Sequence, residues 1–298
     1  MYETILVPTD GSSGSTLAAK HAFQLAETFD ATVHAVHAVD TAAYDPIFHD
    51  LGVDRSAVRT QSSSRAFEPI EAAAEEANRP LVTEVVEGAP HEAILRYADE
   101  NGVDLVVMGT HGRTGVERFL IGSVAVRVVR LSDAPVVTVR TGGEEPTGSY
   151  DDVLVPTDGS DYARAAADRA IAVAEAYGAT VHALNVVDLT EAAGFFDAGG
   201  ISPEFVERLD REGAETAEGV AETAREAGLR AVADVRHGTP HREIREYASE
   251  NGIDLIAMGT HGRTGVGRYA LGSVTERVVR TADAPLLTVR GPPEQEEE

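Results

Sequence analysis

The sequence predicts two tandem doubly wound α/β domains, each a five-stranded parallel sheet in the order 3-2-1-4-5 with helices on both faces. A length of 298 residues suggests about two domains. The sequence also repeats itself: residues 5–12 resemble 153–160, and residues 99–140 align without gaps on 249–290. Short apolar runs alternate with helix-like segments in each half. That alternation is typical of a parallel sheet covered on both faces.

The predicted domain boundaries follow the repeat. We expect residues 1–140 and 151–290 to form the two domains, since each half is long enough for its own core. Residues 141–150 have the composition of a linker. Residues 291–298 are mostly proline and glutamate and are predicted to be a disordered acidic tail.

Turn signals and apolar periodicity order the elements of the first half. The predicted strands are 4–8, 31–39, 81–87, 103–108 and 135–140. A helix follows the first strand, because Leu17, His21, Leu25 and Phe29 recur every four residues. The other predicted helices cover about 53–78, Pro90 to about Asn101-Gly102, and a segment after Ser123 that presents Val124, Val128 and Leu131. The second half repeats this order.

A glycine-rich pattern, G-x2-G-x9-G-S, follows the fourth predicted strand in each half. Its members are Gly109, Gly112, Gly122 and Ser123, and then Gly259, Gly262, Gly272 and Ser273. Glycines let the backbone approach a ligand closely, and a helix N-terminus offers unpaired amides to phosphate. Residues 108–116 are identical to 258–266, whereas 41–87 barely match 189–237. We therefore predict a phosphate site in each half; the alternative is that the glycines only shape a long loop.

The first strand of each half ends in a Pro-Thr-Asp-Gly-Ser turn. In an open α/β sheet, ligands bind at the carboxyl ends of strands where the winding reverses, here between strands one and four. The turn and the glycine loop, almost 100 residues apart, are therefore expected to meet. Asp10 and Asp158 would bind a ribose hydroxyl or a metal-bound water there. The alternative is that these aspartates are helix N-caps.

Basic and histidine side chains inside the loop are further candidates. Arg113 and Arg263, with Arg118 and Arg268 five residues on, suit phosphate but could equally pair with carboxylates. His111 and His261 could contact the ligand or be ordinary loop histidines. No histidine spacing indicates a metal site, and His34 and His37 should face opposite sides of their strand.

Several catalytic patterns are missing from the sequence. It holds no G-x-x-x-x-G-K-[ST] phosphate loop, no G-x-G-x-x-G after the first strand and no G-x-S-x-G nucleophile elbow. No Ser-His-Asp set can be assembled from spacing. We therefore assign no catalytic residue and expect binding without efficient turnover.

The formal net charge is -25, and Lys20 is the only lysine. Such an acidic surface disfavours nucleic acid and anionic membranes as partners. It is typical of proteins from microbes that keep molar salt in the cytoplasm, where self-repulsion is screened; the alternative is an ordinary acidic protein. The chain has no cysteine, no long apolar run and no signal-peptide pattern, so we expect a cytoplasmic protein.

At these residues the chain resembles the universal stress protein family in its tandem two-domain form, over about 1–140 and 151–290. The carriers are the glycine motif, the Pro-Thr-Asp-Gly-Ser turn, and Asp-Ala-Pro-x-x-Thr-Val-Arg at 133–140 and 283–290. The glycine motif marks the family's nucleotide-binding branch. The resemblance implies ATP, ADP or AMP, with or without Mg²⁺, in each half.

The resemblance also implies roles for single residues. Asp10 and Asp158 would contact ribose, Ala38 and Val186 would meet adenine through their backbone, and the loops would hold the phosphates. The residues expected to line the first site are Pro8, Thr9, Asp10, Ala38, Met108, Gly109, His111, Gly112, Arg113, Gly122, Ser123 and Val124. Those of the second are Pro156, Thr157, Asp158, Val186, Met258, Gly259, His261, Gly262, Arg263, Gly272, Ser273 and Val274.

Three functions follow as hypotheses. The first is an ATP-binding stress protein that acts as a nucleotide-dependent sensor or regulator. The second is a slow ATPase or nucleotide transferase on the same scaffold, and the third is a protein-interaction module without nucleotide. The resemblance further implies that strands 135–140 and 285–290 pair antiparallel within the chain, as an intramolecular pseudo-dimer; a homodimer is the other assembly considered.

Overall fold

The computed structural model describes residues 1–40, 55–112, 121–142, 145–189, 202–262 and 271–291, without the side chains of 55–59. The chain divides into two compact units, Met1–Gly148 and Ser149–Glu298. Four predicted residues, Arg113, Arg118, Arg263 and Arg268, lie outside the described residues, as does the predicted acidic tail after Gly291.

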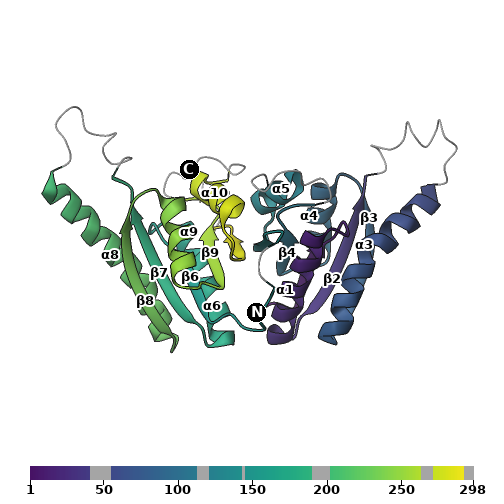
Figure 1. Ribbon diagram of the computed structural model, residues 1–298, viewed down its shortest axis with the longest axis horizontal. Helices are drawn as coiled ribbons and strands as arrows, with labels where there is room; N and C mark the ends of the chain where they lie inside the picture. The colour runs from purple at the N-terminus through teal and green to yellow at the C-terminus, as the bar shows by residue number, and fades with distance from the viewer. Residues whose placement is uncertain (41–54, 113–120, 143–144, 190–201, 263–270, 292–298) are drawn as a thin grey trace, which may run out of the picture. The chain divides into compact units, whose positions relative to one another are not determined.

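Both units follow the predicted alternation of strands and helices (Figure 1). The first unit contains β1 (Thr4–Pro8), α1 (Ser13–Phe29), β2 (Thr32–Val39), α3 (Arg55–Ala77), β3 (Leu81–Glu87), α4 (Pro90–Glu100), β4 (Leu105–Gly109), α5 (Ser123–Leu131) and β5 (Val136–Val139). The second contains β6 (Asp152–Pro156), α6 (Asp161–Tyr177), β7 (Thr180–Val187), α8 (Pro203–Glu226), β8 (Arg230–His237), α9 (Pro240–Glu250), β9 (Leu255–Gly259), α10 (Ser273–Thr281) and β10 (Leu286–Val289).

The predicted strand order is confirmed in both units. The first sheet runs β3-β2-β1-β4-β5 and the second β8-β7-β6-β9-β10. Neighbouring strands are parallel within each unit. β1 therefore lies between β2 and β4, and β6 between β7 and β9. The winding reverses at these central strands. The carboxyl ends of β1 and β4 therefore lie side by side in the first unit, and those of β6 and β9 lie side by side in the second.

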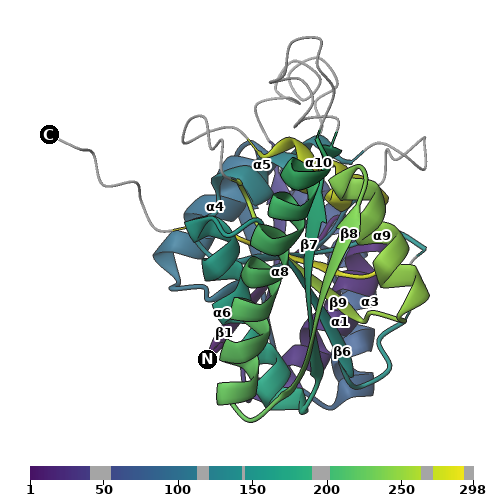
Figure 2. The same cartoon turned by 90° about the vertical axis from the view of Figure 1, so that its left-hand side faces the viewer.

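Helices cover each sheet in two layers. α1 packs with α3, and α4 packs with α5; in the second unit α6 meets α8, and α9 meets α10. Figure 2 shows α8 and α9 on opposite sides of β7 and β8. The central strands are consequently buried on both faces: Ile5, Leu6 and Val7 have no exposed surface, nor do Val153 and Leu154. Such strands read as continuous apolar runs.

Sequence signals explain where the helices begin and end. Ser12 and Ser160 cap α1 and α6, each accepting a backbone amide with its side chain. The predicted start of α4 at Pro90 is confirmed, as is its stop at Asn101 followed by Gly102 in the left-handed region. His34 and His37 face opposite layers as expected, since they contact Tyr97 of α4 and Phe67 of α3.

The fourth strand begins two residues later than predicted. Residue 103 was expected to start it, but β4 begins at Leu105. The reason is Asp104, whose Oδ2 accepts the amides of Glu3 at 2.8 Å and Thr4 at 3.0 Å. Asp254 does the same for Asp151 and Asp152. The aspartate thus binds the start of the central strand with its side chain, and the fourth strand begins only after it.

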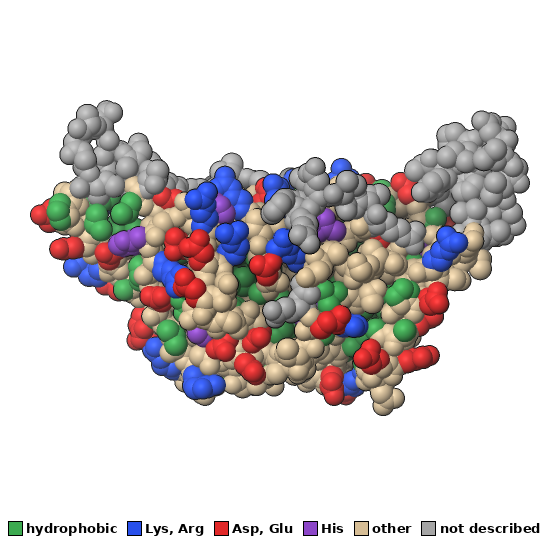
Figure 3. Space-filling model, in the orientation of Figure 1, with side chains coloured by type: hydrophobic (Ala, Val, Ile, Leu, Met, Phe, Trp, Pro, Cys, Tyr) green, Lys and Arg blue, Asp and Glu red, His purple; other side chains and the backbone are tan. Residues whose placement is uncertain are grey.

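No helix within the described ranges is long and apolar enough to cross a membrane. Acidic side chains are spread over the visible surface of both units in Figure 3. This distribution agrees with a chain that carries 50 acidic and 25 basic residues.

Candidate functional site

The turn after β1 is built by its own side chains. The Gly11 amide donates to Thr9 Oγ1 at 3.1 Å, and the Ser12 amide donates to Asp10 Oδ1 at 3.0 Å. Gly11 has φ +76°, a conformation that glycine adopts without strain. Thr9 is buried and also donates its hydroxyl to Ala66 O at 3.0 Å. One carboxylate oxygen of Asp10 thus shapes the turn.

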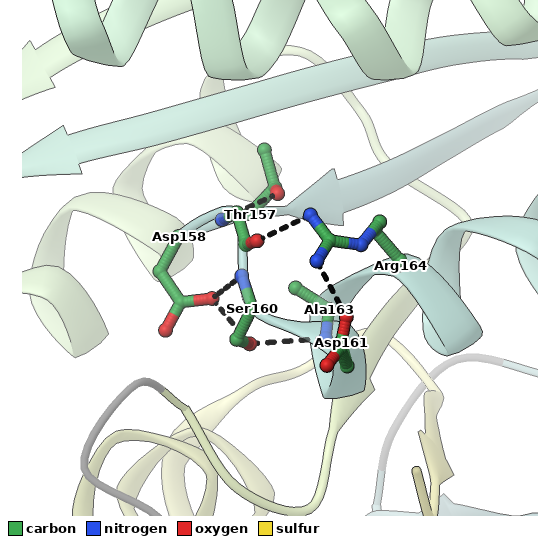
Figure 4. A network of polar contacts seen from close by, with 7 residues as sticks. Thr157, Asp158, Ser160, Asp161, Ala163 and Arg164 are labelled. Carbon is green, nitrogen blue, oxygen red and sulfur yellow. Dashed lines mark hydrogen bonds and ion pairs between the residues drawn. The ribbon is translucent and has the colours of Figure 1, made fainter. Parts of the chain in front are cut away.

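The turn after β6 repeats this arrangement (Figure 4). The Gly159 amide donates to Thr157 Oγ1 at 3.2 Å. Ser160 donates its amide to Asp158 Oδ1 at 3.0 Å and its hydroxyl to the same oxygen at 2.6 Å. Asp158 is therefore oriented by two donors from one residue.

The alternative role for the two aspartates, helix capping, is wrong. The capping residue of α1 is Ser12, whose Oγ accepts the Ser15 amide at 3.3 Å. The capping residue of α6 is Ser160, which accepts the Ala163 amide at 3.2 Å. The Asp residues stand two positions earlier, at the carboxyl end of the central strand.

The second strand of each unit holds the turn in place through a side chain that was not predicted to belong to the site. His37 Nδ1 lies 2.8 Å from Thr9 O, and His37 Nε2 lies 2.8 Å from Ser62 Oγ. In the second unit Asn185 Nδ2 donates to Thr157 O at 2.8 Å. Both side chains are buried. A histidine in one unit and an asparagine in the other thus form a hydrogen bond with the carbonyl that precedes the aspartate. In the sequence, only their matching positions in the repeat could have indicated this shared role.

The two described ends of the glycine loop meet each other. The Gly122 amide donates to Thr110 O at 2.7 Å, and the Gly272 amide donates to Thr260 O at 2.8 Å. Thr110 itself donates its amide to Val139 O of β5 at 2.9 Å. The start and the end of the G-x2-G-x9-G-S pattern therefore lie together at the carboxyl end of β4, and equally of β9.

The loop also meets the aspartate turn. A Cβ built on Gly112 would lie 2.4 Å from Asp10 Oδ2, and one on Gly262 would lie 2.6 Å from Asp158 Oδ2. Real Cβ atoms do not come so close, so only glycine fits without movement. The expected meeting of two distant segments at the carboxyl ends of adjacent strands is present in each unit.

Gly109 allows the first turn of α1 to approach the sheet, and Gly259 does the same for the first turn of α6. A Cβ on Gly109 would stand 2.7 Å from the backbone of Gly14, and one on Gly259 would stand 2.8 Å from the backbone of Tyr162. These glycines therefore permit close packing of a helix on the sheet, while Gly112 and Gly262 face the carboxylates.

The helices that follow the loops begin without a side-chain cap. α5 starts at Ser123 with Gly122 in the capping position, and α10 starts at Ser273 with Gly272 there; neither makes a side-chain cap hydrogen bond. Ser123 is the first residue of α5 and does not cap that helix. First-turn amides have no partner within a helix and carry a partial positive charge, so each helix start can accept an anion.

Each loop histidine has one ring nitrogen with a contact and one without. His111 Nδ1 lies 2.9 Å from Thr110 Oγ1, and His261 Nδ1 lies 3.0 Å from Thr260 Oγ1. In both rings Nε2 is buried and has no hydrogen-bond partner among the residues that the structure describes. A buried polar atom without a partner is costly, so a ligand atom that formed a hydrogen bond with Nε2 would be stabilising.

The remaining predicted residues lie around the same edge. Pro8 and Pro156 end β1 and β6, and Met108 and Met258 are buried in β4 and β9. The other four, half-buried at the carboxyl ends of β2 and β7 or in the first turns of α5 and α10, are Ala38, Val186, Val124 and Val274. Arg113 and Arg263 lie outside the described residues.

A groove of about 660 Å³ lies elsewhere, between α8 and β8. Its walls carry Glu215, Glu218, Glu222 and Asp234 and no basic side chain. Four carboxylates would repel a polyphosphate, and the groove contains none of the predicted site residues. Among the residues that the structure describes, no group of three or more His, Asp or Glu side chains is placed to hold a metal ion.

Comparisons with known proteins agree with the repeat. Residues 1–140 and 149–290 each match the model of the universal stress protein family. A universal stress protein from Methanocaldococcus jannaschii is 38% identical over 146 residues, which are 49% of this chain and 86% of that protein. A putative universal stress protein from Staphylococcus haemolyticus is 34% identical, over 48% of this chain and 86% of its own length. The crystal structure of a universal stress protein from Archaeoglobus fulgidus matches with a TM-score of 0.69 and 20% identity, covering 98% of this chain and 97% of that one.

Proposed function

Because the chain belongs to the universal stress protein family and carries that domain twice, we propose that each half binds one adenine nucleotide. ATP is the first candidate ligand, with ADP and AMP as alternatives, with or without Mg²⁺. The protein would act in a stress response as a nucleotide-dependent sensor or regulator. A role of this kind fits the cytoplasm, the compartment that the sequence indicates.

One observation carries the proposal: the contact between the glycine loop and the aspartate turn. Gly112 lies against Asp10, and Gly262 lies against Asp158, although about 100 residues separate the members of each pair. A glycine-rich backbone and a helix start on one side, with a carboxylate on the other, suit a molecule with phosphates at one end and sugar hydroxyls at the other.

Each part of the nucleotide has its own proposed partners. Phosphates would lie at the uncapped starts of α5 and α10, near Gly122 and Gly272, and His111 and His261 would each direct Nε2 at an oxygen. Asp10 and Asp158 would accept ribose hydroxyls through Oδ2. Adenine would lie over the ends of β2 and β7 and meet the backbone of Ala38 and Val186. When Mg²⁺ accompanies the nucleotide it neutralises phosphate charge, a useful property in so acidic a chain.

Ligand identification tests the proposal directly. We expect mass spectrometry of the protein purified without added nucleotide to release an adenine nucleotide. We also expect ATP to raise the melting temperature of the nucleotide-free protein, because a ligand that binds only the folded state stabilises it. The variant Asp10→Ala/Asp158→Ala should keep its fold and lose most of that shift. A wild-type protein with no released nucleotide and no shift with ATP, ADP or AMP would instead favour the interaction module.

The enzyme alternative needs a separate experiment. We expect single-turnover mixing with Mg²⁺ and ATP to give bound, unchanged ATP. Hydrolysis that Gly122→Val abolishes would favour a slow ATPase or transferase. Gly122 suits this test because a Cβ there would lie 3.2 Å from Thr110 O, close enough to disturb the loop without reaching the core.

We also propose that the segments 135–140 and 285–290 pair antiparallel within one chain. The absence of cysteine permits a clean test by site-directed spin labelling. Labels at Arg140→Cys and Arg290→Cys should report a fixed distance that does not change on dilution with unlabelled protein. A distance that disappears on dilution would indicate a homodimer.

A further inference from the structure

The two candidate sites differ in the first turn of the helix that faces the glycine loop, and most of all in the size of its second residue. Gly14 is the second residue of α1, and Tyr162 is the second residue of α6. The two positions correspond in the repeat, since both lie four residues after the site aspartate. The smallest residue in one half is thus matched by one of the largest in the other.

In the first unit the space beside Gly14 is already occupied. A Cβ on Gly14 would lie 2.6 Å from His111 O and 2.7 Å from Thr141 Oγ1. Thr141, which follows β5, supplies the side chain here. No side chain of residue 14 could fit without moving the loop.

In the second unit the glycine and the larger residue have changed places. Gly291 occupies the position of Thr141, and a Cβ there would lie 2.4 Å from Tyr162 Cδ1. The pair Gly14 and Thr141 of the first half thus corresponds to the pair Tyr162 and Gly291 of the second. The tyrosine ring takes the place of the threonine side chain, and it is the larger of the two.

The Tyr162 ring contacts the loop histidine. Its centroid lies 5.1 Å from that of His261, with the planes at 47°. The next residue, Gly262, lies against the Asp158 carboxylate. A continuous run of contacts thus joins Tyr162 to the ribose-side carboxylate. No ring contact of His111 is found in the described part of the first unit, where Gly14 stands in the same place.

We infer that the two nucleotide sites are not equivalent, and that Tyr162 makes the second site the tighter one by fixing the His261 ring before the ligand arrives. The inference rests on the proposed nucleotide function. Ordering a side chain costs binding free energy, and a side chain that is held in place beforehand does not incur that cost on binding. An aromatic contact of this size corresponds to roughly threefold to tenfold in affinity.

A second difference between the sites contributes little. Arg164 Nη1 donates to Gly159 O at 2.7 Å, and its other nitrogen pairs with Asp161, as Figure 4 shows. The first half has Thr16 there. The Arg164 and Asp161 side chains are 64% and 71% exposed, and exposed ion pairs contribute little to stability. Arg164→Thr should therefore change ATP affinity by less than about twofold.

Calorimetric titration of the full chain with ATP tests the inference. Asp10→Ala leaves the second site, and Asp158→Ala leaves the first. We expect the Asp10→Ala protein to bind ATP roughly three to ten times more tightly than the Asp158→Ala protein. In the Asp10→Ala background, Tyr162→Ala should remove this advantage, whereas Tyr162→Phe should keep it because the ring remains. Tyr162→Gly/Gly291→Thr copies the first half and should weaken binding like Tyr162→Ala.

A measurement without ligand separates this inference from the proposed function. In the nucleotide-free protein, NMR relaxation of the imidazole rings should show His261 more restricted than His111, and Tyr162→Ala should remove the difference. Equal ring mobility, or equal ATP affinities unaffected by Tyr162→Ala, would overturn the inference. Different mobility in a protein that binds no nucleotide would overturn the proposed function and leave the bracing role of Tyr162 standing.

Discussion

Gly112 lies directly against the carboxylate of Asp10, so that a Cβ on the glycine would stand 2.4 Å from Oδ2. The two residues come from the ends of β4 and β1, which are adjacent strands of the sheet. Their contact places a carboxylate oxygen of Asp10 beside backbone that carries no side chain. The loop therefore cannot gain a side chain here without turning the carboxylate away.

Gly112→Ala should weaken nucleotide binding at the first site by about tenfold, because the rotated carboxylate loses a hydrogen bond of about 1.5 kcal/mol to the ribose. The measurement is calorimetric titration in the Asp158→Ala background. Gly219→Ala is the control, since a Cβ there meets nothing within 4 Å, and alanine favours the surrounding helix. If Gly112→Ala left the nucleotide affinity unchanged, Asp10 would not be part of the binding site.

His37→Asn should cost little stability, because Asn185 makes the same bond to Thr157 O in the second half. His37→Leu should cost about 1–3 kcal/mol, since the buried Thr9 carbonyl loses its partner. Urea unfolding of the two variants and wild type measures both. Equal losses for the two variants would mean that ring packing against Phe67, and not the hydrogen bond, is what matters.

The protein should become less stable as pH falls from about 7 to 5.5, and His34 should account for part of this. Burial lowers the pKa of His34 from its ordinary 6.5, and the negative charge of Glu84 opposes the shift more weakly. The folded state therefore binds this proton less readily than the unfolded state, so stability is lost below the unfolded pKa. The ring also meets Tyr97, with Nδ1 2.9 Å from the hydroxyl.

His34→Gln should flatten the fall in melting temperature over this pH window. A wild-type slope that His34→Gln leaves unchanged would assign the effect to other groups.

Diluting salt from molar to millimolar should lower the melting temperature. A net charge of -25 repels itself, and the screening length grows from about 3 Å at 1 M to about 30 Å at 0.01 M. Scanning calorimetry in KCl measures the effect, and an equal concentration range of a neutral osmolyte controls for water activity. A constant melting temperature would contradict the high-salt interpretation of the composition.

Much of the fold could be predicted because its signals are local. Ser12 before α1, Pro90 at the start of α4 and Gly102 after it each act within a few residues. The register of the repeat then carried each prediction to the second half. The start of β4 was misplaced because Asp104 bonds to residues about 100 positions away, and no local signal records such a contact.

The site was predictable in outline and not in detail. Two glycine patterns and two aspartate turns indicated where a ligand would lie, because parallel strands bring their carboxyl ends to one edge. The supports were not predictable: His37 and Asn185 differ in type, and Gly14 and Tyr162 differ even more. Each works through a contact with a residue that is distant in the sequence, which can be recognised only once the elements are in place.

The central position of β1 has a consequence for folding. Its neighbour β4 is synthesised about 100 residues later, and Glu3 is bonded to a carboxylate 101 residues away. While a ribosome makes each half, one long edge of the first strand therefore stays unpaired until the fourth emerges. Nascent chains should be most prone to aggregate in that interval, and two successive halves expose the cell to it twice.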